Sequence, residues 1–280
     1  MTDALAPRRG HSRRRHLAGL AALLACAAAR AAPSARVKVA CVGDSMIDGI
    51  WGGLLRLVQR ESCLASRIEL GRFGRNGTGL ARGDTLDWVA ELARITQSYR
   101  PTILLASLGL NDHQQIVAPG RERVAYGAAQ WTDAYRARVA AFLSQGARAD
   151  AGLVWIGTPA MRESAMQAQA ARLDEIVAET IAQIADPKIA YVAPWRLSLS
   201  GEDRYRQYGP APGGARVQLR APDGVHFTPA GYDLVADHVL PQLLSHLQRS
   251  GIDLVYPCLR LGGGDERIPF ERRSSDRAAL

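Results

Sequence analysis

The chain has 280 residues, of which 47% are hydrophobic and 22% charged, which fits a globular protein with one sizeable core. Its formal net charge is +8, but six arginines and one aspartate within residues 1–31 supply five of those charges. The remaining chain therefore carries only +3, a balance that gives no support for a nucleic-acid-binding surface.

Residues 1–31 predict an export signal. A basic stretch ends at Arg15-His16, a short apolar run covers Leu17–Ala29, and Ala29-Arg30-Ala31 matches the small-residue pattern of a cleavage site. The apolar run is shorter than the ~20 residues of a membrane-spanning helix, so we expect a periplasmic or secreted protein whose mature domain does not insert into the membrane. An uncleaved anchor, or a lipoprotein tethered through acylated Cys26, are the alternatives.

Apolar runs and helix-period segments alternate along residues 36–250. The predicted strands are Val37–Val42, Ile68–Phe73, Thr102–Leu108, Leu153–Thr158 and Ile189–Ala193. The predicted helices cover residues 49–62, 84–99, 131–147, 163–185 and 229–249. This alternation indicates βαβ units, so we expect one α/β domain with helices on both faces of a doubly wound, five-stranded parallel sheet.

Two long polar connections, residues 112–130 and 198–224, interrupt the alternation, and such connections are often functional. Residues 251–280 form a polar tail that we predict to be disordered. Cys41 lies in a predicted buried strand, whereas Cys63 and Cys258 could form a disulfide in an oxidising compartment. The sequence alone does not show whether these two cysteines are close.

Gly43-Asp44-Ser45 follows the first predicted strand and precedes a helix. The carboxyl end of a strand is where an open α/β sheet binds ligands, and the free N–H groups of a helix start stabilise negative charge. Ser45 is therefore a candidate nucleophile. The tripeptide alone would occur by chance in roughly one chain of this length in ten, so the assignment depends on partners elsewhere.

Asp223-Gly224-Val225-His226, just before the last predicted helix, supplies such partners. A histidine can accept the serine proton, and a carboxylate can orient the imidazole and stabilise its charged form. The alternative interpretation of this motif is an aspartate that caps the helix and a histidine on the surface.

Two further motifs follow predicted strands. The side-chain amide of Asn111, in Gly109-Leu110-Asn111-Asp112, is a neutral donor that could hold an oxyanion, although an isolated motif of this kind is more often a plain turn. Asn76-Gly77-Thr78-Gly79 has glycines that let a backbone N–H approach a ligand, with a plain loop as the alternative. Its glycine spacing departs from the dinucleotide-binding pattern, which disfavours a nucleotide cofactor.

The order of these motifs, Ser, Gly, Asn and then Asp-x-x-His, resembles the SGNH (GDSL-like) hydrolase superfamily over roughly residues 37–249. The stretch Trp155–Arg162 resembles an envelope-associated bacterial branch of uncharacterised function. The resemblance implies a three-layer α/β/α, flavodoxin-like fold. It also implies a serine esterase that needs no metal or organic cofactor.

The resemblance assigns a role to each motif. Ser45 would be the nucleophile, His226 the general base and then acid, and Asp223 the residue that orients His226. The N–H groups of Ser45 and Gly79 and the side-chain amide of Asn111 would form the oxyanion hole. Gly77 is an alternative to Gly79, which we favour because Thr78-Gly79 is closer to the Ser-Gly pair of the family.

Five residues are weaker candidates for substrate contacts: Asp44, Arg75, Asp112, His113 and Met161. A surface loop explains His113 equally well, and core packing is favoured for Met161. His238 and His246 lie on the last predicted helix without a metal-like spacing, so we expect both on the surface.

The sequence thus predicts an exported esterase that removes a short acyl group, with an O-acetyl ester on a cell-envelope glycan as one candidate substrate. Envelope-assembly proteins are candidate partners, and nucleic acid is not. Two alternatives remain open: a periplasmic O-acyltransferase that uses the same triad, and a non-catalytic glycan-binding protein on the same scaffold.

Overall fold

A computed structural model describes residues 36–120, 122–192, 204–210, 214–254 and 256–257. The predicted export segment lies outside these residues, as does most of the predicted tail. Cys63 is disulfide-bonded, but Cys258 is not among the described residues, so their pairing stays a prediction. None of the helices in these ranges is long and apolar enough to cross a membrane.

The central sheet has five parallel strands in the order β2-β1-β3-β6-β7. Its strands are β1 (Val37–Gly43), β2 (Ile68–Gly74), β3 (Ile103–Ser107), β6 (Gly152–Ile156) and β7 (Ile189–Val192). All five were predicted, with ends that differ by at most two residues. The chain places β2 on one side of β1 and then β3, β6 and β7 on the other. The carboxyl ends of β1 and β3 therefore form the switch point at which such sheets bind ligands.

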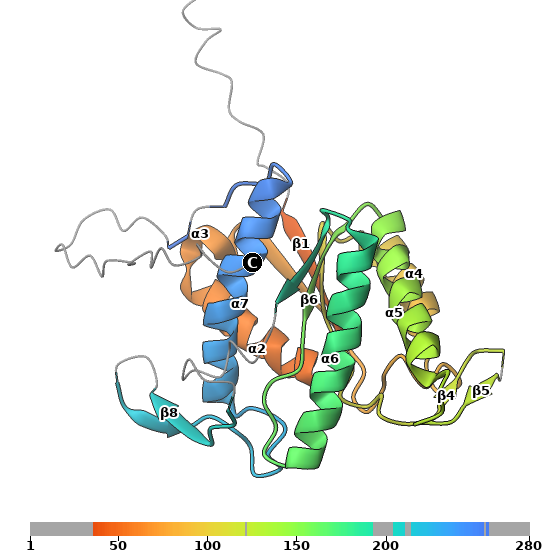
Figure 1. The fold of residues 1–280 in the computed structure, drawn as a ribbon. Helices are drawn as coiled ribbons and strands as arrows, with labels where there is room; N and C mark the ends of the chain where they lie inside the picture. Colours follow the sequence, from red (N-terminus) through yellow and green to blue (C-terminus); the bar gives the residue numbers. More distant parts are fainter. Residues whose placement is uncertain (1–35, 121, 193–203, 211–213, 255, 258–280) are drawn as a thin grey trace, which may run out of the picture. The chain divides into compact units, whose positions relative to one another are not determined.

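Helices cover both faces of the sheet (Figure 1). They are α2 (Ser45–Arg60), α3 (Ser62–Ala65), α4 (Trp88–Tyr99), α5 (Trp131–Arg148), α6 (Ser164–Ile184) and α7 (Pro229–Arg249). Along β1, Val39 and Cys41 pack with α2 and α7, whereas Ala40 and Val42 pack with the side of α4, α5 and α6. Strand residues buried on both faces confirm the predicted three-layer α/β/α fold.

Two helices begin four residues away from their predicted starts, because an aspartate caps each of them. The Asp44 side chain accepts the N–H of Met46 at 2.9 Å, so α2 begins at Ser45 and not at residue 49. The Asp87 side chain accepts the N–H of Val89 at 3.1 Å, so α4 begins at Trp88 and not at residue 84.

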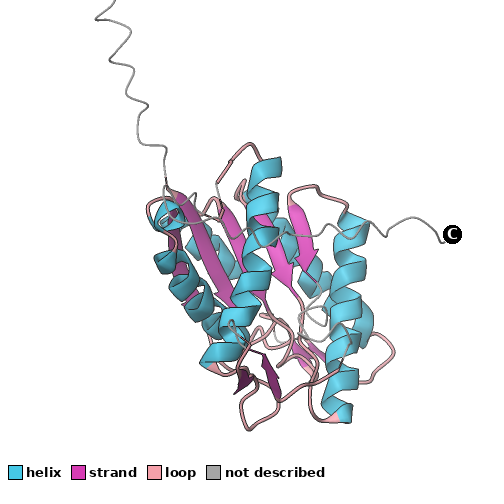
Figure 2. Cartoon of the chain, turned by 90° about the vertical axis from the view of Figure 1, so that its left-hand side faces the viewer, coloured by secondary structure: helices cyan, strands magenta, loops and turns pink. Residues whose placement is uncertain are grey.

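Two short antiparallel hairpins occupy the connections that we expected to be loops. One pairs β4 (Ile116–Val117) with β5 (Arg123–Val124), and the other pairs β8 (Tyr208–Pro210) with β9 (Arg216–Gln218). Figures 1 and 2 show both hairpins beyond the carboxyl ends of the central strands. Strands of two or three residues are too short to produce the alternating pattern from which strands are predicted.

Helices α2 and α7 pack closely because α2 carries two glycines where it meets Tyr232 of α7. A Cβ atom on Gly49 would lie 1.9 Å from Cζ of the Tyr232 ring. One on Gly53 would lie 2.3 Å from the carbonyl oxygen of Tyr232. Helix α2 begins at Ser45, and α7 begins three residues after His226. The packing of α2 on α7 therefore holds Ser45 and His226 near each other.

Candidate active site

Ser45 lies at the carboxyl end of β1, where the backbones of β1 and β3 approach closely. Gly43 has a φ of +146°, and a Cβ atom there would lie 1.9 Å from the carbonyl oxygen of Ser107. The N–H of Asp44 donates to that same oxygen at 3.1 Å. Only glycine fits this position, and the turn that it makes places Ser45 in the first turn of α2.

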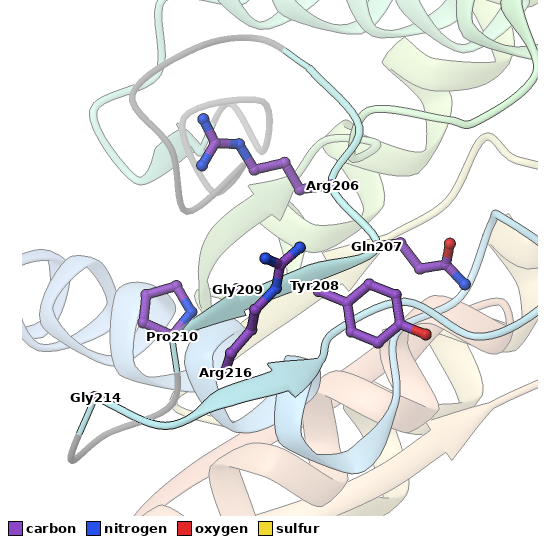
Figure 3. A pocket seen from close by; sticks show the side chains of 7 residues that line it. All are labelled: Arg206, Gln207, Tyr208, Gly209, Pro210, Gly214 and Arg216. Carbon is purple, nitrogen blue, oxygen red and sulfur yellow. The ribbon is translucent and has the colours of Figure 1, made fainter.

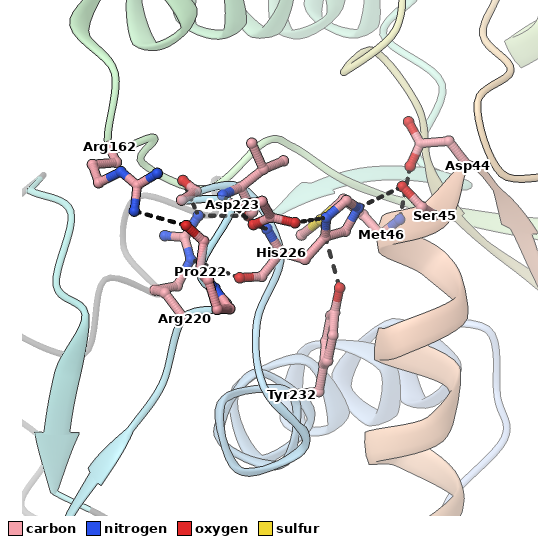
Figure 4. A network of polar contacts seen from close by, with 11 residues as sticks. Asp44, Ser45, Met46, Arg162, Arg220, Pro222, Asp223, His226 and Tyr232 are labelled. Carbon is pink, nitrogen blue, oxygen red and sulfur yellow. Dashed lines mark hydrogen bonds and ion pairs between the residues drawn. The ribbon is translucent and has the colours of Figure 1, made fainter.

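The structure brings Ser45, His226 and Asp223 into one chain of hydrogen bonds (Figure 4). Ser45 Oγ lies 2.7 Å from Nε2 of His226, and Nδ1 of His226 lies 2.7 Å from Oδ2 of Asp223. With the ring proton on Nδ1, His226 donates to the carboxylate and accepts the hydroxyl proton of Ser45. These contacts are the geometry that a serine nucleophile and its base require.

Local hydrogen bonds keep Asp223 ionised. Partial burial alone would raise the pKa of Asp223, but hydrogen bonds from the His226 ring and from the N–H groups of Val225 and His226 outweigh it and lower the pKa to about 2. The two backbone groups donate to Oδ1 at 2.8 and 3.0 Å, which leaves Oδ2 for the imidazole. Gly224, with a φ of +76°, makes the turn that permits this arrangement.

Arg220, which the sequence analysis did not single out, supports the same loop. Its side chain is only 3% exposed and is paired with no carboxylate among the described residues. Its guanidinium donates to the carbonyl oxygens of Ala160 and Val225, both at 2.6 Å, and more weakly to those of His226 at 3.4 Å and Gly224 at 3.5 Å.

Aromatic rings enclose the same guanidinium. It lies 4.8 Å from the ring centre of Tyr205 and 4.4 Å from that of Phe227, distances typical of cation–π contacts. Burial lowers the pKa of Arg220 to about 10, so the group stays charged at neutral pH. In a chain with many arginines, no local pattern distinguishes this one, because its partners are backbone carbonyls.

Asn111 and Gly79 also come together, at the loop after β2. Nδ2 of Asn111 donates one hydrogen to the carbonyl oxygen of Thr78 at 2.9 Å, which leaves its second hydrogen for another acceptor. A Cβ atom on Gly79 would lie 2.0 Å from Oδ1 of Asp112, whereas one on Gly77 would meet no atom within 4 Å. The close approach of the loop backbone to Asp112 therefore requires glycine at residue 79. The role of the Gly79 N–H as an oxyanion donor stays a prediction.

The predicted substrate contact of Asp112 is wrong, because the side chain is 0% exposed and fully engaged. It accepts the N–H groups of Leu80 and Ala81 at 3.0 and 2.8 Å and the hydroxyl of Tyr135 at 2.9 Å. Burial raises the pKa of Asp112, and these hydrogen bonds act against that rise. Asp112 thus holds the loop that contains Gly79.

Asp44 and Met161 are also buried and offer no surface to a substrate. Burial raises the pKa of Asp44 to about 7, and its carboxyl caps α2 instead. Arg75 is exposed and lies 3.6 Å from Glu91, while His113 is half-buried in the turn after Asn111. The substrate contacts predicted for Arg75 and His113 remain predictions.

The expectation that His246 lies on the surface is wrong. Its side chain is 1% exposed, because α7 packs across the sheet and turns this residue toward β6. A Cβ atom on Gly152 would lie 2.7 Å from Nε2 of His246. Within the described residues, no three His, Cys, Asp or Glu side chains are grouped so that they could hold a metal ion.

A family model described as "Protein of unknown function (DUF459)" matches residues 38–242, which include Ser45, Asp223 and His226. The chain belongs to this family. A comparison with curated proteins found no match.

Solved structures share the fold. A GDSL-like lipase from Bacteroides thetaiotaomicron is 15% identical, with a TM-score of 0.50 over 80% of this chain and 96% of that one. A variant of an acetyl-xylooligosaccharide esterase from Geobacillus stearmophilus is 15% identical, with a TM-score of 0.52 over 75% and 95%. A carbohydrate esterase family 3 protein from Talaromyces cellulolyticus is 15% identical, with a TM-score of 0.52 over 76% and 99%. The fold is that of the SGNH (GDSL-like) hydrolases.

Proposed function

We propose that the protein is a serine ester hydrolase that takes a short acyl group onto Ser45 and releases it to water. One observation supports this proposal above the others, namely the continuous chain from Ser45 Oγ through His226 to Asp223, with 2.7 Å at both contacts. A protein that only binds a glycan has no need of this arrangement.

In the first step, Ser45 Oγ attacks the ester carbonyl carbon while its proton passes to Nε2 of His226. Asp223 stabilises the imidazolium that forms. The tetrahedral intermediate then breaks its bond to the alcohol oxygen, which takes the proton from His226 and leaves. Water, deprotonated by the same histidine, then attacks the acyl carbon. The second tetrahedral intermediate breaks its bond to Ser45 Oγ, which takes the proton back from His226 as the carboxylic acid leaves.

The negative charge of each tetrahedral intermediate falls on the former carbonyl oxygen. We propose that the N–H groups of Ser45 and Gly79 and the free hydrogen of the Asn111 amide hold it. Ser45 lies in the first turn of α2, where N–H groups have no partner within the helix. Loss of one such donor elsewhere lowers kcat by roughly 10²–10³.

For the substrate, we propose an O-acetyl ester on a cell-envelope glycan, reached after export. Two proteins with the same fold are named as an acetyl-xylooligosaccharide esterase and a carbohydrate esterase, so an acetylated sugar is the first substrate to test.

The test is hydrolysis of p-nitrophenyl esters from acetate to octanoate by the purified full chain. Ser45→Ala and His226→Ala should each lower kcat at least 10³-fold, since either change removes the nucleophile or its base. Ser98→Ala, an exposed serine on α4, is the matched control and should match the wild type. Wild-type rates in both triad variants would refute the assignment, and release that requires an added glycan acceptor would favour acyl transfer.

A further inference from the structure

The β8–β9 hairpin carries a hollow of about 570 Å³ that the proposed reaction does not use (Figure 3). Its lining residues are Arg206, Gln207, Tyr208, Gly209, Pro210, Gly214 and Arg216. Ser45, Asp223 and His226 are not among them, and the described residues that line the hollow include no aspartate or glutamate. The hollow is therefore a basic site distinct from the triad.

Arg206 and Arg216 are exposed and free to bind a ligand. Within the described part of the chain, neither guanidinium forms an ion pair, whereas exposed arginines such as Arg72 and Arg94 are held by two hydrogen bonds to a carboxylate. The guanidinium of Arg216 lies 5.7 Å from the ring centre of Tyr208, which is itself 45% exposed.

Strand β9 leads directly from this hollow to the triad. At about 3.3 Å per residue, the four steps from Arg216 to Arg220 span at most about 13 Å. Arg220 pairs with Phe227, the neighbour of His226. We expect a carrier of several sugar units to contact both the hollow and Ser45, which a small acyl ester would not do.

We infer that the hollow is a subsite for an anionic glycan, which bears carboxylate or phosphate groups and carries the ester that Ser45 attacks. The inference rests on the proposed esterase function. A guanidinium matches either oxyanion with two parallel hydrogen bonds, and the Tyr208 ring offers an apolar face to a sugar. Binding energy gained at such a remote site favours large substrates over small ones.

The first experiment measures binding without catalysis. Titration calorimetry on the full chain carrying Ser45→Ala uses trigalacturonate, a trisaccharide monophosphate and neutral galactotriose. We expect binding of at least one anionic probe, weaker at high salt, and a loss of at least 10-fold when Arg206→Gln and Arg216→Gln are added. Arg172→Gln, an exposed arginine on α6, is the matched control. Equal binding of the neutral probe, or no loss in the double variant, would overturn the subsite.

The second experiment measures catalysis on the wild-type background. Arg206→Gln with Arg216→Gln should lower kcat/KM for acetylated trigalacturonate at least 10-fold and leave that for p-nitrophenyl acetate unchanged. An equal loss on both esters would overturn the inference, because it would place the arginines in the reaction itself. If the Ser45→Ala chain binds the anionic probe but the wild type cleaves no ester, the proposed function fails and the anion subsite stands.

Discussion

Arg220 makes the position of His226 depend on one buried cation. Its guanidinium donates to the carbonyl oxygen of Val225, next to His226, and to that of Ala160, in the connection after β6. The rings of Tyr205 and Phe227 enclose it. A buried arginine without a carboxylate partner destabilises the folded state unless its N–H groups donate hydrogen bonds. Arg220 therefore needs these carbonyl oxygens, and the carbonyl oxygens need Arg220 as their donor. We therefore regard Arg220 as a positioning residue for the His226 loop.

Replacing Arg220 should impair both stability and turnover. In Arg220→Met the buried carbonyls lose their donors, at about 1–3 kcal/mol each when unsatisfied, and the shift of His226 should lower kcat up to about 100-fold with little change in KM. Arg220→Lys should recover part of kcat, because one ammonium can replace some of these bonds. Steady-state kinetics at a temperature where each variant is folded provides the test. A purely structural role predicts a lower Tm with wild-type kcat.

Asp223 should be needed for turnover and not for folding. In Asp223→Asn the amide can still accept the backbone N–H groups, but it favours the wrong tautomer of His226, so kcat should fall by roughly 10⁴ while Tm falls only slightly. Asp133→Asn, which removes a surface ion pair with Arg136 on α5, is the matched control. Wild-type turnover in Asp223→Asn would remove this carboxylate from the mechanism.

At the scale of elements, the contact between α2 and α7 determines how the nucleophile and its base meet. Ser45 begins α2, and His226 comes just before α7. Gly49 and Gly53 let Tyr232 approach the α2 backbone, so the separation of the two helices depends on the absence of side chains at two positions. The interhelical distance is thus tied directly to the 2.7 Å contact between Ser45 and His226.

A single methyl group at this contact should disturb both packing and activity. In Gly53→Ala the new Cβ meets the Tyr232 backbone, so we expect a loss of about 1–3 kcal/mol in the free energy of unfolding and a lower kcat. Gly52→Ala is the matched control: its Cβ would lie 3.5 Å from an Arg56 nitrogen, and alanine favours the helix by about 0.5–1 kcal/mol. Urea unfolding measures both, and equal effects would contradict this account.

For the whole molecule, three buried carboxyls with raised pKa values, those of Asp44, Asp112 and Asp174, link stability to pH. Burial raises the pKa of Asp44 and of Asp174 to about 7. Asp174 lies on α6 and accepts the N–H and hydroxyl of Thr158, which hold the turn after β6. Between pH 4 and 7 the folded protein keeps protons on these carboxyls that the unfolded chain releases. As a result, these carboxyls make the free energy of unfolding fall as pH rises from about 4 to 7.

Asp174→Asn should reduce that decline. The amide cannot ionise, so the contribution of Asp174 disappears while those of Asp44 and Asp112 remain. Free energies of unfolding from urea titrations at pH 4.5 and 7.5 provide the measurement, with Glu175→Gln on the same helix as the matched control. A steeper decline in Asp174→Asn than in the wild type would show that the carboxyl of Asp174 is not the group responsible.

The fold was predictable because β1, β3 and β6 are buried on both faces and read as apolar runs, with helix-period segments between the strands. The motifs located Ser45, Asn111 and the Asp223–His226 pair, since each lies directly after a predicted strand or directly before a predicted helix. The sequence did not indicate a role for Arg220. It wrongly predicted a substrate contact for Asp112 and a surface position for His246. The roles of these side chains depend on neighbours distant in the sequence, and periodicity along one segment carries no information about such contacts.

Different parts of the fold hold the triad and surround it, and this affects which residues can be varied. Ser45 begins α2 and His226 lies just before α7, and backbone packing sets the spacing of these two helices. Both small hairpins belong to connections outside that contact. We therefore expect exposed hairpin side chains, such as those of Arg123, Tyr208 and Arg216, to be exchangeable with little effect on the geometry of the reaction. Variation in β8 and β9 offers a route to new specificities, and efforts to redirect this protein to other esters should begin there.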